Sequence, residues 1–172
     1  MKIPKTVGKL TKLFEKLGAR DPEAWAQSQI EEGLPQLQRY LFLRQAWAEV
    51  LGDEEVGWVD AKIEEAEDDP RGQFAGVGLA LKRAVAAGVA KQDLVDIARG
   101  VQAELLFQFC CLLDEPGLSE PEVKDLGWGL FEVDENGDPI PTRIEGLHED
   151  MLDMDPTGRE MCPRDKIGRA HV

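Results

Sequence analysis

The segment from Lys91 to Leu113 constrains the fold more than any other part of the chain. It runs for 23 residues without a proline and is followed by Pro116 and Gly117. One stripe of apolar residues recurs along it at helical spacing: Leu94, Ile97, Val101, Leu105, Phe109 and Leu112. Further apolar residues at 106, 107, 110 and 113 widen this stripe. A helix that is apolar nearly all round belongs in a protein interior, so we expect it at the centre of the fold.

Boundary signals divide the residues before this segment into further helices. The apolar spacing predicts a helix from about Thr6 to Leu17. Asp21, Pro22 and Glu23 then form a start signal, because an N-cap acceptor is followed by a proline that loses no hydrogen bond at the first helical position. A third helix is expected between Pro35 and Gly52.

A fourth and a fifth helix follow. We expect Asp53 to cap the fourth, which ends at Asp69 and Pro70. The fifth, from Phe74 to about Ala87, is rich in alanine and glycine. Such small side chains should let a neighbouring helix approach closely.

The periodicity changes after the polar linker from Glu115 to Asp125. Residues 128–133 predict a strand, and Asn136 with Gly137 is typical of a tight hairpin turn. Pro139 and Pro141 would confine a return strand to an edge. A short helix around 147–151 completes a mainly α fold, an array or bundle of about five or six helices with a small C-terminal β-hairpin and loop region.

The sequence predicts a single domain in which residues 1–115 form the helical core. Residues 116–165 are expected to form a hairpin and loop extension packed on that core. The end of the chain, from Ile167 to Val172, matches the translation of a common sequencing adapter in one reading frame. We therefore expect residues 166–172 to be a non-native tail and the natural chain to continue past about Asp165.

Charge argues against nucleic acid as a partner, because the formal net charge is −14 and phosphate binding needs a positive surface. The first 20 residues are the exception, with six Lys or Arg against one acid. We expect this basic helix to dock on the acidic remainder of the protein rather than on a membrane.

Cysteine usage and hydropathy predict a cytoplasmic protein. Cys110, Cys111 and Cys162 do not have the spacing of a disulfide framework. No apolar run has the length of a signal peptide core or of a membrane span. We expect Cys110 and Cys111 to pack in the core and Cys162 to be exposed.

One motif has the spacing of a calcium-binding loop. Its oxygen ligands would be Asp134, Asn136, Asp138 and Glu145. The sixth position of such a loop needs glycine for a sharp turn, and here it is Pro139. A plain hairpin turn is therefore the expectation, calcium is the weaker alternative, and no cofactor is predicted.

The candidate catalytic residues centre on His148, which lies beside Glu149. A histidine oriented by a carboxylate can act as a general base. Arg159 is a further candidate, and Asp155 would have to converge with them in one pocket. Because no nucleophile can be identified, the sequence favours a protein that is not an enzyme.

Three segments near the C-terminal end, together with residues 99–113 before them, resemble a pattern found in small bacterial proteins of unassigned function. They are residues 128–131 (WGLF), 146–149 (GLHE) and 155–161 (DPTGREM). The resemblance implies a bacterial cytoplasmic protein and transfers no functional residue. The candidate binding residues come from the expected irregular structure, where binding groups concentrate: Trp128, Phe131, His148, Asp155, Arg159 and Glu160.

These features predict a protein-interaction module that binds a protein partner with a basic surface, such as an immunity-type antitoxin that masks a basic toxin. A small hydrolase-like enzyme centred on His148 is one alternative. A structural homo-oligomer subunit is another, and it would need a symmetric apolar patch that includes Trp25 or Trp58. The oligomeric state stays open.

Overall fold

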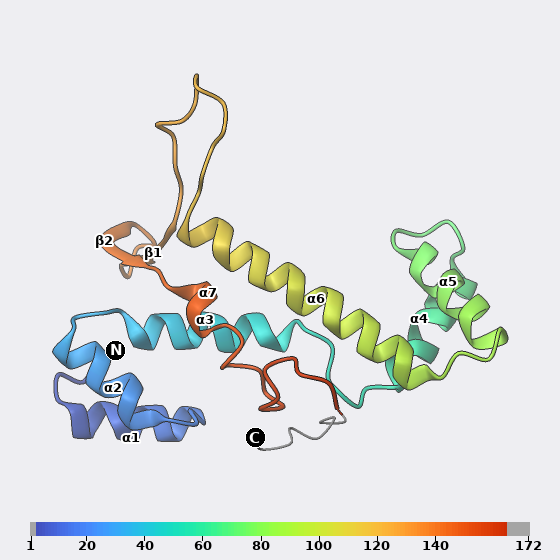
Figure 1. Ribbon diagram of the computed structural model, residues 1–172, viewed down its shortest axis with the longest axis horizontal. Helices are drawn as coiled ribbons and strands as arrows, with labels where there is room; N and C mark the ends of the chain where they lie inside the picture. The colour runs from blue at the N-terminus through green and yellow to red at the C-terminus, as the bar shows by residue number, and fades with distance from the viewer. Residues whose placement is uncertain (1–2, 165–172) are drawn as a thin grey trace, which may run out of the picture. The chain divides into compact units, whose positions relative to one another are not determined.

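The computed structural model describes residues 3–164 (Figure 1). The mainly helical fold is confirmed: the described residues form seven helices and one two-stranded antiparallel hairpin. The adapter-like residues 167–172 lie outside the described part of the chain. The elements are α1 (Val7–Leu17), α2 (Pro22–Glu31), α3 (Gln36–Ala48), α4 (Gly57–Asp68), α5 (Ala75–Ala86), α6 (Lys91–Asp114), β1 (Leu130–Val133), β2 (Pro139–Ile144) and α7 (Leu147–Asp150).

The chain folds into two compact units, each made of two separate stretches of sequence. The first unit joins the residues up to Ala46 with Phe107–Met154, and the second joins Trp47–Leu106 with the residues from Asp155 onward. Helices α3 and α6 each contribute residues to both units. The division at residue 116 that the sequence predicts stays a prediction, and both units take residues from either side of it.

In the first unit, α1, α2 and α3 enclose a small apolar core. Leu10, Phe14, Ala26, Leu37 and Tyr40 are buried in it. Three aromatic rings organise this cluster, since the Phe14 and Tyr40 centroids are 5.5 Å apart and edge-on, and Trp25 lies 5.5 Å from Tyr40. The predicted boundaries are confirmed: Asp21 accepts a hydrogen bond from the Ala24 N–H, and Gly18 ends α1 at a φ of 85°.

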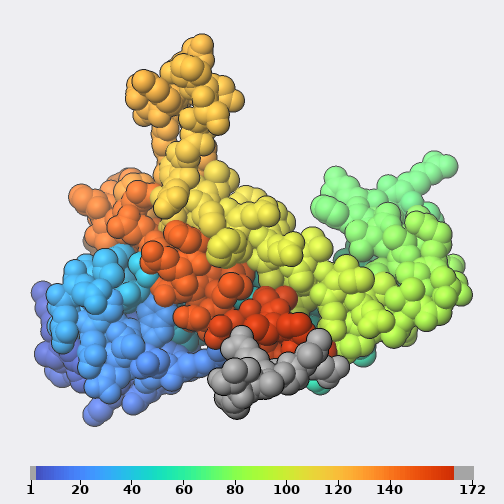
Figure 2. Space-filling view, in the orientation of Figure 1, coloured from blue at the N-terminus to red at the C-terminus, as the bar shows by residue number. Residues whose placement is uncertain are grey.

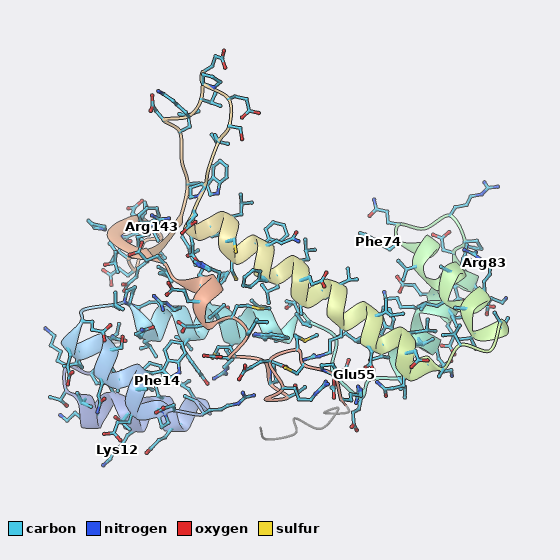
Figure 3. All side chains as sticks on the ribbon, in the orientation of Figure 1. Lys12, Phe14, Glu55, Phe74, Arg83 and Arg143 are labelled. Atoms are coloured by element: carbon cyan, nitrogen blue, oxygen red, sulfur yellow. The ribbon has the colours of Figure 1, made fainter. Side chains whose placement is uncertain are left out.

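The lysines of α1 lie on the opposite side from this core. Figure 3 shows Lys12 pointing away from α3 while Phe14 points toward it. Lys5, Lys9, Lys12 and Lys16 are exposed. Within residues 3–164 no salt bridge joins them to an acidic side chain. Apolar packing, rather than the expected docking on acidic groups, therefore holds α1 in place.

The hairpin also belongs to the first unit. Leu130 pairs with Ile144 and Phe131 with Arg143, and the register shifts before Val133 meets Pro139. The predicted return strand therefore forms, with Pro139 at its first position, where a missing donor is tolerated. Figure 2 shows the residues between α6 and β1 standing out from the rest of this unit.

In the second unit, α5 packs against α4 at very close range (Figure 1). A Cβ atom on Gly78 would lie 1.9 Å from the Lys62 carbonyl oxygen and 2.6 Å from the Ala66 Cβ. The predicted close approach through small residues is thus confirmed. Leu51, Val59, Leu81 and Val95 form the apolar cluster of this unit.

The predicted role of Asp53 is wrong. Helix α4 begins at Gly57, with Val56 at the N-cap and no side-chain cap. The Asp53 carboxylate instead contacts the guanidinium groups of Arg159 and Arg164. A charge-assisted hydrogen bond is about twice as strong as a neutral one, so two arginine partners outweigh a cap.

The predicted orientation of α6 is also wrong. Its expected inward stripe is largely solvent-exposed, whereas Val95, Ala103 and Cys110 are buried on another face. Arg99 and Asp114 are buried on that face as well, and each has a partner there. Burying an unpaired charge is costly, so these two paired side chains fix which face of α6 turns inward.

Candidate functional site

The most unusual surface of the molecule is one apolar face of α6. Five large side chains form a row along it, which we call the α6 ridge: Ile97, Val101, Leu105, Phe109 and Leu112, with exposed fractions of 62%, 60%, 51%, 54% and 44%. Neighbouring residues of the row are four positions apart in the sequence, except for the last two, which are three apart. Since one continuous helix carries all five, helix geometry alone places them side by side.

The ridge extends beyond α6 at its C-terminal end. The Trp128 Nε1–H donates a hydrogen bond to the Leu112 carbonyl oxygen over 2.8 Å. The Trp128 side chain is itself 44% exposed, and Leu126 nearby in sequence is 63% exposed. Phe131, the other aromatic candidate for binding, is exposed on β1. Trp128 thereby adds an aromatic surface, the residue type most enriched at protein interfaces, next to the ridge.

An acidic edge runs beside the ridge. Asp93, Glu104 and Glu115 are exposed and recur every 11 residues, which is close to three helical turns. The hydrogen bond from the Glu115 N–H to the Cys111 carbonyl oxygen continues the turn of α6 to that residue. Lys91 is paired with Asp60 at 2.6 Å and Arg99 is buried, whereas Arg143 donates to the Leu113 carbonyl oxygen at the C-terminal end of α6. The negative border of the ridge is therefore the one beside Asp93 and Glu104.

The candidate catalytic histidine has a carboxylate partner that the sequence analysis missed. His148 Nδ1 lies 2.7 Å from Asp114 Oδ2, and the same oxygen accepts a hydrogen bond from the His148 backbone N–H. The Phe107 ring packs edge-on against the imidazole at 6.4 Å. The His148 side chain is half-buried, while Glu149 is exposed. Asp114 could have been noticed as an acid at the end of an apolar helical segment.

The described residues place no nucleophile in hydrogen-bond contact with this histidine. Among residues 3–164, no hydrogen bond joins the His148 ring to a serine, threonine or cysteine side chain. Cys110, one turn before Asp114, is fully buried, and burial together with the Asp114 charge raises the pKa of its thiol to about 12. A thiol with such a pKa stays protonated and unreactive at neutral pH.

A buried arginine attaches α7 to α3 in the same unit. Arg39 is 5% exposed and its guanidinium lies 2.6 Å from the Asp150 carboxylate. Gly146 precedes α7 at a φ of 73°, and a Cβ there would lie 2.4 Å from the Arg39 guanidinium. Glycine suits this position for two reasons: the positive φ disfavours other residues, and the Arg39 side chain occupies the space that a Cβ would need.

In the second unit, Asp155 is at the centre of a buried polar cluster. Its carboxylate accepts hydrogen bonds from the Arg99 guanidinium at 2.5 Å, from the Thr157 hydroxyl at 2.7 Å and from the Met161 N–H at 3.1 Å. Burial by itself would raise the pKa of this carboxyl. The Thr157 and Met161 hydrogen bonds and the Arg99 charge outweigh burial, so the pKa lies below its usual range.

The same cluster includes Asp53, Asp96 and two further arginines. Arg159 contacts Asp53, and Arg164 contacts Asp53 at 3.0 Å and Asp96 at 2.9 Å. Hydrogen bonding to Arg164 lowers the pKa of Asp96. Three arginines and three aspartates pair with one another, although the Arg99 Nε is buried without a hydrogen-bond partner and lies 3.8 Å from Asp53. These pairs connect the C-terminal loop to Asp53, Asp96 and Arg99, which is a structural role.

The residues predicted to form one site therefore have separate partners. His148 pairs with Asp114 in the first unit, whereas Asp155 and Arg159 pair with Arg99 and Asp53 in the second. Glu160 is exposed, at a φ of 51°. The sequence feature that indicates these buried ion pairs is the presence of charged residues, above all Arg99, within the apolar stretch of α6.

The calcium-like motif forms the hairpin turn. Asp134 Oδ1 accepts hydrogen bonds from the Asn136 N–H at 2.8 Å and the Asp138 N–H at 3.0 Å, and these bonds lower the pKa of Asp134. Glu145 lies 3.7 Å from Arg143. Over residues 3–164, no group of three or more His, Cys, Asp or Glu side chains is arranged to hold a metal ion.

Two broader findings bear on the site. None of the helices formed by residues 3–164 combines the length and the apolar character needed to cross a membrane. No protein-family model matches the chain, and neither a curated protein nor a solved structure matches it significantly.

Proposed function

We propose that this chain is a protein-interaction module that binds a basic partner through the α6 ridge. The exposed ridge itself is the observation that carries this proposal. Monomeric soluble proteins rarely leave a contiguous row of large apolar side chains in water, and such patches mark interaction sites. Trp128 adds an aromatic side chain beside Leu112.

Charge identifies the kind of partner. The net charge of −14 and the acidic edge formed by Asp93, Glu104 and Glu115 favour a partner whose rim is basic. Complementary charge increases the association rate and disfavours other acidic partners. In a bacterial cytoplasm such a module would act as an immunity-type protein that masks a basic toxin.

Affinity capture with matched variants tests the proposal. The ridge variant carries Val101→Gln and Leu105→Gln, and the control carries Val77→Gln and Val89→Gln, which replace two exposed apolar residues outside the ridge, one on α5 and one in the loop before α6. We expect the original chain and the control to retain a basic protein from bacterial lysate at low salt and to release it as salt rises. The ridge variant should retain none.

Two results would overturn the proposal. One is retention of the same protein by the folded ridge variant. The other is a stable dimer, measured by light scattering, that the ridge substitutions dissociate, because the ridge would then be covered by a second copy of the chain.

The pair of His148 and Asp114 supports a second candidate, a hydrolase. A tautomer whose Nδ1–H donates to the Asp114 carboxylate would leave Nε2 as the acceptor of a proton from water. A panel of activated esters tests this candidate, with His148→Gln as the variant and Glu149→Gln as the control. Hydrolysis that only His148→Gln abolishes would favour the enzyme, whereas the interaction proposal expects no such activity.

A further inference from the structure

We propose that the partner presents an amphipathic α-helix with a basic edge, and that this helix packs directly on the α6 ridge. The inference rests on the proposed function and specifies the chemistry of its partner. It follows from the spacing of the ridge, from the charges beside it and from the side chains that are already buried elsewhere in the molecule.

The spacing of the ridge fits a helix. Ile97, Val101, Leu105 and Phe109 follow one another at intervals of four residues, so they form a row inclined to the helix axis. Such rows fit between the equivalent rows of a second helix, at a crossing angle of about −50° and an interaxial distance of about 8–10 Å.

A bound strand fits less well. Strand addition needs free backbone N–H and C=O groups at a sheet edge. The backbone groups within α6 already bond to one another, so its exposed face offers side chains alone. From Ile97 to Leu112 the ridge rises about 22 Å. A helix that crosses it at about −50° would contact its middle, around Val101 and Leu105.

The acidic edge requires positive charge on the partner. Glu104 lies one residue before Leu105, and Asp93 and Glu115 continue the same side of α6 toward its two ends. A helix with Lys or Arg along one border of its apolar face would place these cations near Glu104, the carboxylate beside the middle of the ridge. An anionic membrane would meet the same carboxylates with repulsion, so a lipid surface is not the occupant.

The chain's own basic helix is not a suitable occupant. Helix α1 has lysines on one face, but Leu10 and Phe14 on its apolar face are fully buried against α2 and α3. A second copy could supply that face only by dismantling its own core. A second copy that offered its own α6 ridge would bring its acidic edge against this one, and like charges repel. The ridge therefore fits a helix from a different protein.

Binding of labelled peptides to the full chain, measured by fluorescence anisotropy, tests the inference. The probe is a synthetic helix of about 18 residues with leucines four apart and lysines along one border. A shuffled peptide of the same composition has no apolar face, and a third peptide carries glutamate in place of lysine. We expect only the first peptide to bind, and a phosphatidylserine vesicle to show no binding.

Matched variants separate the ridge from general charge attraction. Val101→Gln with Leu105→Gln should weaken probe binding at least about tenfold, since two large apolar contacts are lost. Glu104→Lys should weaken it by about threefold to tenfold at low salt. Glu64→Lys on α4 makes the same charge change at an exposed position away from the ridge and should leave binding within about twofold.

Equal binding of the shuffled peptide, or equal weakening by Glu64→Lys and Glu104→Lys, would overturn the inference. The failures of the two proposals differ. A lysate partner that depends on the ridge, without binding of the helical probe, removes the helix and keeps the interaction function. Capture that does not depend on the ridge removes the interaction function itself.

Discussion

Burial and hydrogen bonding have opposite effects on the pKa of the Asp155 carboxyl group. The side chain is fully buried, yet Arg99, Thr157 and the Met161 N–H stabilise its charged form. Breaking a buried pair costs more than the pair contributes, because the remaining charge is left without compensation. Asp155 therefore has a larger role in stability than any exposed acid of this chain.

Replacing Asp155 with asparagine should lower the free energy of unfolding by roughly 3 kcal/mol, because Arg99 loses its closest anion. Urea denaturation measures this change, with Glu160→Gln as the exposed control. The pKa of Asp155 is lower in the folded protein than the value of about 3.9 for an unfolded chain. Its contribution is therefore complete above about pH 4 and is lost as the pH falls through the folded-state pKa. An unchanged acid limb in Asp155→Asn would contradict this assignment.

A second residue-scale prediction concerns Phe74, which Figure 3 shows pointing outward at the start of α5. Its side chain is 80% exposed and its φ is 67°, a left-handed conformation that costs a non-glycine residue about 1–2 kcal/mol. Phe74→Gly should therefore raise the free energy of unfolding by about 1 kcal/mol. Thermal denaturation measures the shift. Arg71→Gly, at an exposed loop position without a positive φ, should give no gain.

At the scale of elements, the contact of α4 with α5 depends on the absence of a single side chain. Gly78 faces the Lys62 carbonyl oxygen, whereas Gly76, two residues earlier in the same helix, has open space around it. The two glycines share a sequence context and differ only in what lies opposite them. This contrast offers a matched test of helix packing.

Gly78→Ala should destabilise the protein by about 1–3 kcal/mol, because the added methyl group forces α5 away from backbone atoms of α4. Gly76→Ala should instead stabilise it by up to about 1 kcal/mol, since alanine favours a helix. Chemical denaturation of both variants gives the comparison. Equal effects of the two substitutions would mean that the helices do not meet at Gly78.

Sequence patterns predicted the helices of this fold better than the faces that they bury. Asp21 and Gly18 act through local hydrogen bonds, so their effect on helix ends was visible in the sequence. The inward face of α6 instead depends on Arg99 and Asp114 finding Asp155 and His148, which are far away in the chain. Apolar periodicity alone predicts the wrong buried face of α6, because it takes account of apolar residues and not of the partners that buried charges require.

Part of the candidate site was likewise visible in the sequence. Trp128 and His148 stand out in the sequence because they are aromatic or titratable residues in irregular segments. The sequence predicts the α6 ridge to be core, since an exposed apolar stripe has the same helical spacing as one that packs internally. Asp53 was assigned to a helix cap because its two arginine partners, Arg159 and Arg164, come more than a hundred residues later.

At the scale of the whole molecule, α6 contributes to the interior of both units. Val95 and Ala103 are buried in the second unit, and Cys110 is buried in the first. A change in the intrinsic stability of this one helix should therefore reach both units. Its middle contains Gly100, where a Cβ would meet no atom within 4 Å.

Gly100→Ala should slow amide hydrogen exchange along α6 on both sides of Leu106. The alanine stabilises the helix by up to about 1 kcal/mol, which corresponds to about fivefold slower exchange for amides that open with it. Mass spectrometry of peptides from each unit measures the effect. Slower exchange in the second unit alone would show that the two halves of α6 open independently.

The interleaved arrangement of the two units matters during synthesis. Residues up to Ala46 must wait for Phe107–Met154 before the first unit is complete, and the 60 residues between them belong to the second. At about 5–20 residues per second, the ribosome needs about 3–12 s to add them. During that interval the apolar core of α1, α2 and α3 lacks Met154, and Arg39 has not yet met Asp150. We expect chaperones that bind apolar segments at the exit tunnel to bind such a nascent chain.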